Sequence, residues 1–174
     1  MFQTPVGSNH RLLYLQNASA WVGGVTLQAR EITVSGAGAY FHTLGGTVSN
    51  CVIRGGGVGS NGTGAAAHMN SGNALLTHCE ITGNHTTEND GDNRFDQAII
   101  RLNNGRVVNC LIHGNTVSKA NAIRSSVIEM NNGTVRNCTI VDNRAANRGV
   151  ISGTGGQVLH CVIAGNKEVS GQGG

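Results

Sequence analysis

The sequence predicts an all-β solenoid, a fold in which short strands from successive repeats stack on one another. Two observations indicate it: a motif recurs five times within 174 residues, and its apolar residues alternate as they do in strands. Self-similarity with a period of about 20–50 residues is typical of solenoids. All five cysteines of the chain lie in these copies, one in each.

Each copy places the same kinds of residue around its cysteine. The cysteines are Cys51, Cys79, Cys110, Cys138 and Cys161. Two residues after them stand Ile53, Ile81, Ile112, Ile140 and Ile163. Just before them stand Asn50, His78, Asn109, Asn137 and His160. We expect each of these sets to form a ladder along the stack.

The spacing within a copy predicts two strands with a bend between them. The cysteine and the isoleucine share one face of a strand, because side chains alternate with period 2. A valine or leucine three residues before the cysteine has the wrong parity for the same flat strand. The bend therefore falls at the asparagine or histidine, residue types that adopt left-handed backbone conformations more often than most.

A third strand is expected upstream, where an apolar residue stands ten positions before each cysteine. These residues are Phe41, Met69, Ile100, Ile128 and Ile151. Successive cysteines are 28, 31, 28 and 23 residues apart, and the extra residues fall at about 55–65, 84–97 and 115–125. We therefore expect three short strands and three corners per coil, with insertions confined to one corner.

With these repeats the chain resembles the right-handed parallel β-helix proteins of the pectin-lyase-like superfamily, over roughly residues 25–170. Its Asn-Cys-x-Ile-x-x-Asn form is similar to the repeats of bacterial surface proteins, including the polymorphic outer membrane proteins. We expect about six coils, five good copies and a degenerate first one. The resemblance implies an asparagine ladder at a tight corner, matched by Asn50, Asn109 and Asn137. This fold hosts lyases, hydrolases, adhesins and phage spikes, so it does not specify a function.

We predict one domain with three parts: an N-terminal cap or partial coil at residues 1–24, the repeats at 25–166 and a polar C-terminal end at 167–174. Leu27, Arg30 and Ile32 are expected to take the valine, cysteine and isoleucine positions of a degenerate first coil. Residues 1–20 lack the basic and apolar regions of a secretory signal peptide. No segment approaches the roughly 20 apolar residues of a membrane-spanning helix.

The cysteines are interpreted as a buried ladder of free thiols. Stacked strands lie about 4.8 Å apart, whereas a disulfide needs Cβ atoms near 3.8 Å. The chain has no Cys-x-x-Cys pair and its histidines are scattered, so we expect no cofactor. The net charge of +3 comes without a basic cluster, which gives no indication of a nucleic-acid partner.

One acidic loop is the alternative to this expectation of no metal. Glu88, Asp90, Asp92 and Asp96 lie within nine residues and could supply several hard oxygen ligands to Ca²⁺. The loop is not an EF-hand, because its glycine falls between two aspartates. A solvated loop remains the other interpretation.

The upstream strand is expected to present an outward row made of His42, Asn70, Arg101, Glu129 and Ser152. The resemblance implies that this sheet faces polysaccharide in the carbohydrate enzymes of the fold. His42, Asn70, Arg101 and Glu129 are therefore candidate binding residues. Arg101 and Glu129 are also the candidate catalytic pair, although a hydrolase needs two or three carboxylates about 5–10 Å apart. A surface ion pair between them is the simpler interpretation.

The function expected from these features is that of a non-enzymatic structural or binding β-helix, extracellular or at a bacterial cell surface, and adhesin-like or filament-forming. The alternative is a fragment of a polysaccharide lyase or glycoside hydrolase. Expected partners are a second copy, bound head to tail at the uncovered apolar end around Val158 and Ile163, and a polysaccharide.

Overall fold

The computed structural model describes residues 1–3, 10–32, 35–59, 63–86, 97–118, 125–145 and 149–168. This described part contains strands, turns and corners but no helix, so no helix in it could cross a membrane. The strands form four sheets, named A to D below. Each turn of the chain visits the sheets in the order B, C, A and D.

Each sheet takes one short strand from every turn. Sheet A contains β1 (Phe2–Gln3), β4 (Thr26–Gln28), β8 (Val52–Arg54), β12 (Glu80–Thr82), β16 (Leu111–His113), β20 (Thr139–Val141) and β24 (Val162–Ala164). Sheet B contains β2 (Leu13–Leu15), β6 (Ala39–Phe41), β10 (Ala67–Met69), β14 (Gln97–Leu102), β18 (Ser125–Met130) and β22 (Ile151–Gly153). Sheet C contains β3 (Trp21–Gly23), β7 (Gly46–Ser49), β11 (Ala74–Thr77), β15 (Arg106–Val108), β19 (Thr134–Arg136) and β23 (Gln157–Leu159). Sheet D contains β5 (Glu31–Ile32), β9 (Gly57–Val58), β13 (His85–Thr86), β17 (Thr116–Val117), β21 (Arg144–Ala145) and β25 (Lys167–Glu168).

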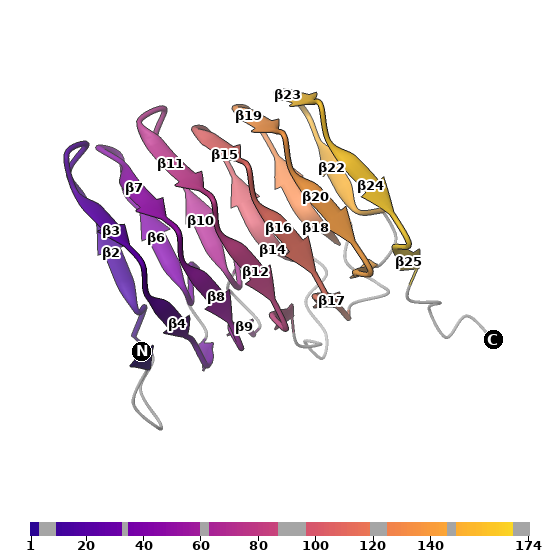
Figure 1. The fold of residues 1–174 in the computed structure, drawn as a ribbon, viewed down its shortest axis with the longest axis horizontal. Helices are drawn as coiled ribbons and strands as arrows, with labels where there is room; N and C mark the ends of the chain where they lie inside the picture. The colour runs from indigo at the N-terminus through magenta and orange to yellow at the C-terminus, as the bar shows by residue number, and fades with distance from the viewer. Residues whose placement is uncertain are drawn as a thin grey trace.

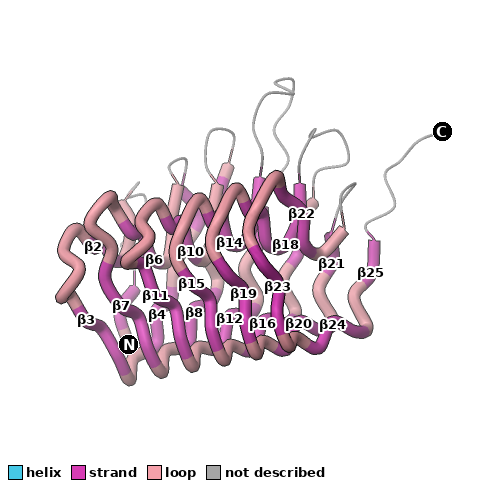
Figure 2. The backbone as a smooth tube through the Cα atoms, turned by 90° about the horizontal axis from the view of Figure 1, so that it is seen from above, coloured by secondary structure: helices cyan, strands magenta, loops and turns pink. Residues whose placement is uncertain are grey.

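Successive turns lie side by side along one axis, so the indigo N-terminal strands and the yellow C-terminal strands form opposite ends (Figure 1). Seen from above, the corners of successive turns line up in rows (Figure 2). Each strand pairs in parallel with the equivalent strand of the next turn. The predicted all-β parallel solenoid is therefore confirmed.

Sheet D was not predicted: three strands were expected in each turn, and the structure has a fourth, short strand in sheet D. Its strands are two residues long and follow directly after the corner that ends each strand of sheet A. A two-residue strand is too short for the alternation of side chains to be visible in a sequence. Sheet D closes the turn before the chain reaches the variable segment that leads back to sheet B.

The core is built from inward ladders, one in each of the three longer sheets. Sheet A stacks Ile53, Ile81, Ile112, Ile140 and Ile163. Sheet C stacks Val48, Leu76, Val107, Val135 and Val158. Sheet B stacks Phe41, Met69, Leu102 and Met130. Except in the last turn these side chains are at most 3% exposed, so each turn buries the apolar face of its neighbours.

The bend predicted before each cysteine is present in all five copies. Asn50, His78, Asn109, Asn137 and His160 have φ between 52° and 54°, in the left-handed region. Asparagine and histidine tolerate this region better than most residues. The bend turns the chain from sheet C into sheet A.

The buried asparagine ladder lies at the opposite end of sheet A from the position that the resemblance implied. Asn50, Asn109 and Asn137 are exposed. Asn84, Asn115 and Asn143 are at most 1% exposed, and they stack with Asn166 between sheets A and D. The side-chain oxygen of Asn143 accepts the Asn115 backbone N–H at 3.1 Å, and that of Asn166 accepts the Asn143 N–H at 2.9 Å. This ladder satisfies backbone groups that would otherwise be buried without a partner.

The register predicted for the first coil was wrong. Leu27 pairs with Ile53 and Val22 with Val48, so they take the isoleucine and valine positions. Arg30 is exposed and lies beyond the strand of sheet A. This first turn has no cysteine to mark its register, and β2 and β3 show that strands of sheets B and C lie within residues 1–24.

Candidate binding face on sheet B

One row of side chains runs along the outer face of sheet B. Its members, aligned strand by strand, are Tyr14, Tyr40, His68, Arg101, Glu129 and Ser152. A second row lies two residues further along the chain, just beyond each strand. It contains His42, Asn70, Asn103, Asn131 and Thr154. We call these two rows together the B face.

The predicted outward row combined residues from both of these rows. Arg101, Glu129 and Ser152 do share one row, but His42 and Asn70 lie in the second row, beside Asn103 and Asn131. The error came from counting back from the cysteine. Phe41 and Met69 stand ten residues before their cysteines, whereas the aligned Leu102 stands eight before Cys110. The corner between sheets B and C therefore also varies in length, so insertions are not confined to one corner.

Arg101 and Glu129 form a buried ion pair. Arg101 Nη1 donates to Glu129 Oε2, and their side chains are only 14% and 2% exposed. Arg101 Nε also donates to Asn103 Oδ1 at 3.1 Å. Two oppositely charged groups that are in contact and removed from water attract each other more strongly than an exposed pair. This differs from the predicted surface ion pair, because the carboxylate is enclosed.

The asparagines of the second row form a chain of amide hydrogen bonds. Asn131 Nδ2 donates to Asn103 Oδ1 at 2.8 Å, and Asn103 Nδ2 donates to Asn70 Oδ1 at 2.5 Å. Asn70 Nδ2 in turn donates to the Tyr40 hydroxyl at 2.8 Å. Repetition of one amide at equal spacing makes this part of the B face rigid.

His68 is a buried histidine of the B face, beside the Arg101–Glu129 pair in the same row. Its Nε2 lies 2.9 Å from Asn70 Oδ1 and 3.2 Å from Asn103 Nδ2, and the residue is 9% exposed. Burial, reinforced by the charges of Arg101 and Arg11, lowers the pKa of His68 to about 4, although the side-chain oxygen of Asn70, which accepts a hydrogen bond from the ring, acts in the opposite direction. His68 is therefore neutral near pH 7.

Aromatic rings occupy the N-terminal end of the B face, a feature that sequence reasoning missed. The rings of Tyr14 and Tyr40 stack with centroids 5.5 Å apart and an interplanar angle of 4°. His42 lies 5.6 Å from Tyr14, and the Arg11 guanidinium lies 4.3 Å from the Tyr40 centroid. Tyr14 was assigned to an N-terminal cap or partial coil, although the alternation in Leu13-Tyr14-Leu15 is a strand signal.

The five cysteines lie stacked between sheets C and A and are all free thiols. Each thiol donates to a backbone carbonyl of its own turn, as Cys110 does to Val108 O at 3.3 Å. Contacts with the thiols of Cys138 and Cys79, together with burial, raise the pKa of Cys110. Cys110, at the centre of the ladder, therefore stays protonated, whereas the contact with the Cys110 thiol lowers the pKa of Cys138 to about 7.

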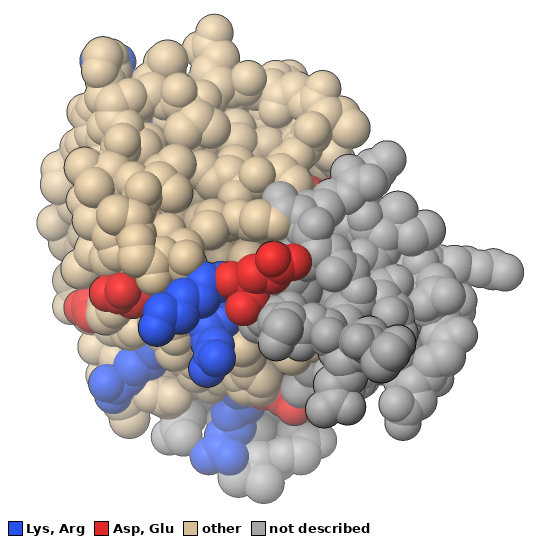
Figure 3. All heavy atoms as spheres, turned by 90° about the vertical axis from the view of Figure 1, so that its right-hand side faces the viewer, with Lys and Arg blue, Asp and Glu red and all other residues tan. Residues whose placement is uncertain are grey.

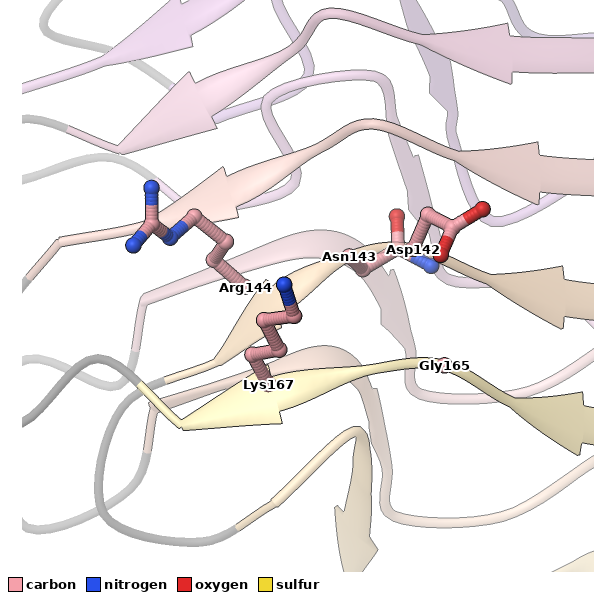
Figure 4. A pocket seen from close by; sticks show the side chains of 5 residues that line it. All are labelled: Asp142, Asn143, Arg144, Gly165 and Lys167. Atoms are coloured by element: carbon pink, nitrogen blue, oxygen red, sulfur yellow. The ribbon is translucent and has the colours of Figure 1, made fainter.

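Among the described residues, no group of three or more His, Cys, Asp or Glu side chains is placed to hold a metal ion. The predicted calcium ligands Glu88, Asp90, Asp92 and Asp96 lie outside the described residues. A shallow pocket of about 190 Å³ lies beside sheet D, where Arg144 and Lys167 extend from neighbouring strands and Asp142 lies at the other end (Figure 4).

Comparison with known proteins adds no family to this description. No protein-family model matches the chain, and no curated protein or solved structure is significantly similar to it. The class that the fold defines is the parallel β-solenoid repeat protein, a class that carries many functions.

Proposed function

We propose that this chain is a non-enzymatic structural and binding β-solenoid of an extracellular or surface protein, adhesin-like or assembling through its ends. The observation that carries the proposal is the buried Arg101–Glu129 pair on the B face. Glu129 is the one carboxylate in the described strands of sheet B, and a cation neutralises it. A glycosidase mechanism requires two carboxylates about 5–10 Å apart, one of which acts on water or the sugar.

The surface location rests on the resemblance of the repeats to those of bacterial surface proteins in the pectin-lyase-like superfamily. The Asn-Cys-x-Ile-x-x-Asn motif supports this resemblance because its isoleucine forms the inward ladder of sheet A and its last asparagine forms the buried ladder between sheets A and D. A rigid stack with few charges suits a spacer or a display scaffold, since each turn contacts only its neighbours.

The binding role centres on the exposed aromatic end of the B face. Tyr14 is 51% exposed and stacks on Tyr40, whose hydroxyl joins the amide chain. A flat apolar ring beside fixed amide groups suits a sugar ring, which has an apolar face and hydroxyl edges. The proposed ligand is therefore a polysaccharide.

Glycan-array binding and affinity electrophoresis test this role. We expect Tyr14→Ala to weaken polysaccharide binding at least tenfold, corresponding to about 1.4 kcal/mol. Trp21→Ala is the matched control, because Trp21 is 64% exposed but lies in sheet C. Equal effects of the two substitutions, or no binding by the wild type, would contradict a polysaccharide site on the B face.

A carbohydrate-active enzyme is the second candidate, favoured by one observation: an arginine and a carboxylate in direct contact on an outer sheet face. A depolymerisation screen of acidic and neutral polysaccharides, with and without Ca²⁺, separates it from the first. The non-enzymatic proposal expects no product. Turnover that disappears in Glu129→Gln, with the circular dichroism spectrum unchanged, would replace it with the enzymatic one.

A further inference from the structure

The C-terminal face of the solenoid exposes residues that are buried in every inner turn. Val158 and Ile163 are 41% and 48% exposed, whereas the aligned Val135 and Ile140 are fully buried. In the space-filling view of this end, several acidic and basic side chains lie in a band across the drawn surface, others lie below the band, and much of the drawn surface above it is uncharged (Figure 3). The strands β22, β23, β24 and β25 are each the last of their sheets, so four strand edges meet on this face.

Backbone donors on this face also lack the partners that inner turns supply. The Asn137 N–H donates to Leu159 O of the next turn at 3.0 Å, and the Asn143 N–H donates to Asn166 Oδ1 at 2.9 Å. The equivalent N–H groups of His160 and Asn166 have no hydrogen-bond partner within the described residues. The face therefore presents donors and apolar side chains in the arrangement that another parallel turn satisfies.

We infer that the N-terminal face of a second copy stacks on this C-terminal face. We also infer that β24 of the first copy competes with β1 of the second copy for the free edge of β4 in that second copy. The inference rests on the proposed assembly through the ends and names which surfaces meet. In register, Ile163 would pack beside Leu27 of the second copy, because Leu27 aligns with the isoleucine ladder. Val158 would pack beside Val22 of the second copy, because Val22 aligns with the valine ladder.

The competition arises because sheet A has an extra strand, β1, at the N-terminal end of the solenoid. β1 pairs with β4, placing Phe2 beside Leu27 and Gln3 beside Gln28, so within the described residues sheet A has seven strands where the other sheets have six. β1 thus occupies the edge of β4 that β24 of another copy needs. While β1 is paired, the two ends cannot meet in all four sheets. A two-residue strand contributes few hydrogen bonds, so its displacement costs little.

Charge complementarity favours a second copy as the occupant. In sheet D the outer positions of Glu31, Gly57, His85, Thr116, Arg144 and Lys167 align along the stack. Arg144 and Lys167 are neighbours of like charge at the C-terminal end (Figure 4). Continuing the row with the second copy places Glu31 next to Lys167, and opposite charges on adjacent strands attract.

One rung of the asparagine ladder is missing at this junction. Arg30 aligns with Gly56 at the ladder position, and arginine has no acceptor for the Asn166 N–H. The junction is therefore weaker than the contact between inner turns, and association should be reversible. Arg30→Asn restores the acceptor and should strengthen stacking.

Sedimentation velocity, light scattering and negative-stain microscopy test the inference on the full chain. The double variant Phe2→Asp/Gln3→Pro displaces β1, and we expect its average mass to rise with concentration beyond that of a dimer. Wild type at the same concentration should remain smaller. Adding Lys167→Glu or Glu31→Lys should weaken association at least tenfold, and combining both reversals should restore it to within about threefold of the β1 variant.

Several outcomes overturn the inference. A β1 variant that stays monomeric removes the competition. Mass that stops at a dimer and ignores Glu31→Lys indicates that two C-terminal faces meet instead. Should the β1 variant unfold, Arg30→Asn in the otherwise wild-type chain carries the test: stronger stacking that Lys167→Glu abolishes supports the inference, and unchanged mass refutes it. Polysaccharide binding through Tyr14 is measured separately, so failure of stacking leaves the binding role standing.

Discussion

Two turns of this solenoid share a motif but differ in what surrounds them. Residues 133–145 and 156–168 each run through sheets C, A and D with the same order of valine, cysteine, isoleucine and asparagine. Ile140 is fully buried and Cys138 is 1% exposed, whereas Ile163 is 48% exposed and Cys161 is half-buried. Both turns nevertheless have the same corner, with φ of 52° at Asn137 and 54° at His160.

The difference shows which properties the motif determines by itself. Local backbone geometry is the same in both turns, so it depends on residues within the turn. Burial depends on the turn above, as in any stack where each repeat contacts only its neighbours. Substitutions at matched positions of these two turns should therefore separate local from neighbour-dependent stability.

The largest expected effect is at the isoleucine ladder. Ile140→Asp places an unpaired charge in a fully buried position and should lower the free energy of unfolding by at least about 4 kcal/mol. Ile163→Asp should cost about 1 kcal/mol or less, because water reaches the position. Urea unfolding followed by circular dichroism measures both. Ile140→Val controls for volume and should cost about 0.5–1.5 kcal/mol; equal losses for the two aspartates would mean that the last turn is covered.

The pH dependence of stability should reveal His68. Its pKa in the folded chain is lowered to about 4, so the unfolded chain binds more protons between pH 6.5 and 4. The stabilisation is complete above pH 6.5 and is lost as the pH falls to 4, by on the order of 3 kcal/mol. The measured quantity is the difference between wild type and His68→Gln across that range. His160→Gln, a substitution of a histidine at an exposed corner, is the matched control. A slope in His68→Gln that equals the wild-type slope would refute the buried neutral histidine.

The parts of the fold that the sequence predicted lie close to a cysteine. No insertion separates the corner residue, cysteine and isoleucine in any copy, so Asn137, Cys138 and Ile140 could be aligned by counting. The alternation of side chains then indicated which of these residues face the core, because successive residues of a strand point to opposite faces of the sheet. This is why the ladders of sheets A and C match the structure.

The B face could not be predicted in the same way. The corner between sheets B and C has two more residues after Phe41 and Met69 than after Leu102, so counting from the cysteine shifted the register. A shift of two keeps the parity, which is why Arg101 and Glu129 were still expected to face outward. Their burial and the low pKa of His68 depend on contacts between turns, which composition and spacing do not encode.

A smaller effect is expected at the asparagine ladder. Asn143 accepts the Asn115 N–H and donates to Ile112 O at 2.9 Å. Asn143→Leu leaves both groups buried without a partner and should cost about 2–3 kcal/mol. Asn166→Leu should cost about 1 kcal/mol, since Asn166 is half-buried and water can replace part of the loss. Hydrogen exchange at the Asn115 amide should accelerate in Asn143→Leu alone; protection that persists there would show that another acceptor serves this N–H.

The smallest expected effect on the free energy of unfolding is at Asn137, an exposed corner residue whose backbone conformation nevertheless contributes to stability. Asn137 is exposed, as Ile163 is, yet its φ of 52° lies where a β-branched residue is strained. Asn137→Val should therefore lower the free energy of unfolding by about 1–3 kcal/mol, whereas Asn137→Gly should cost less because glycine adopts this conformation without a Cβ clash. The same urea titration measures both. If valine and glycine prove equivalent at this corner, the left-handed conformation does not determine stability there, and the shared geometry of the two turns would have to come from stacking as well.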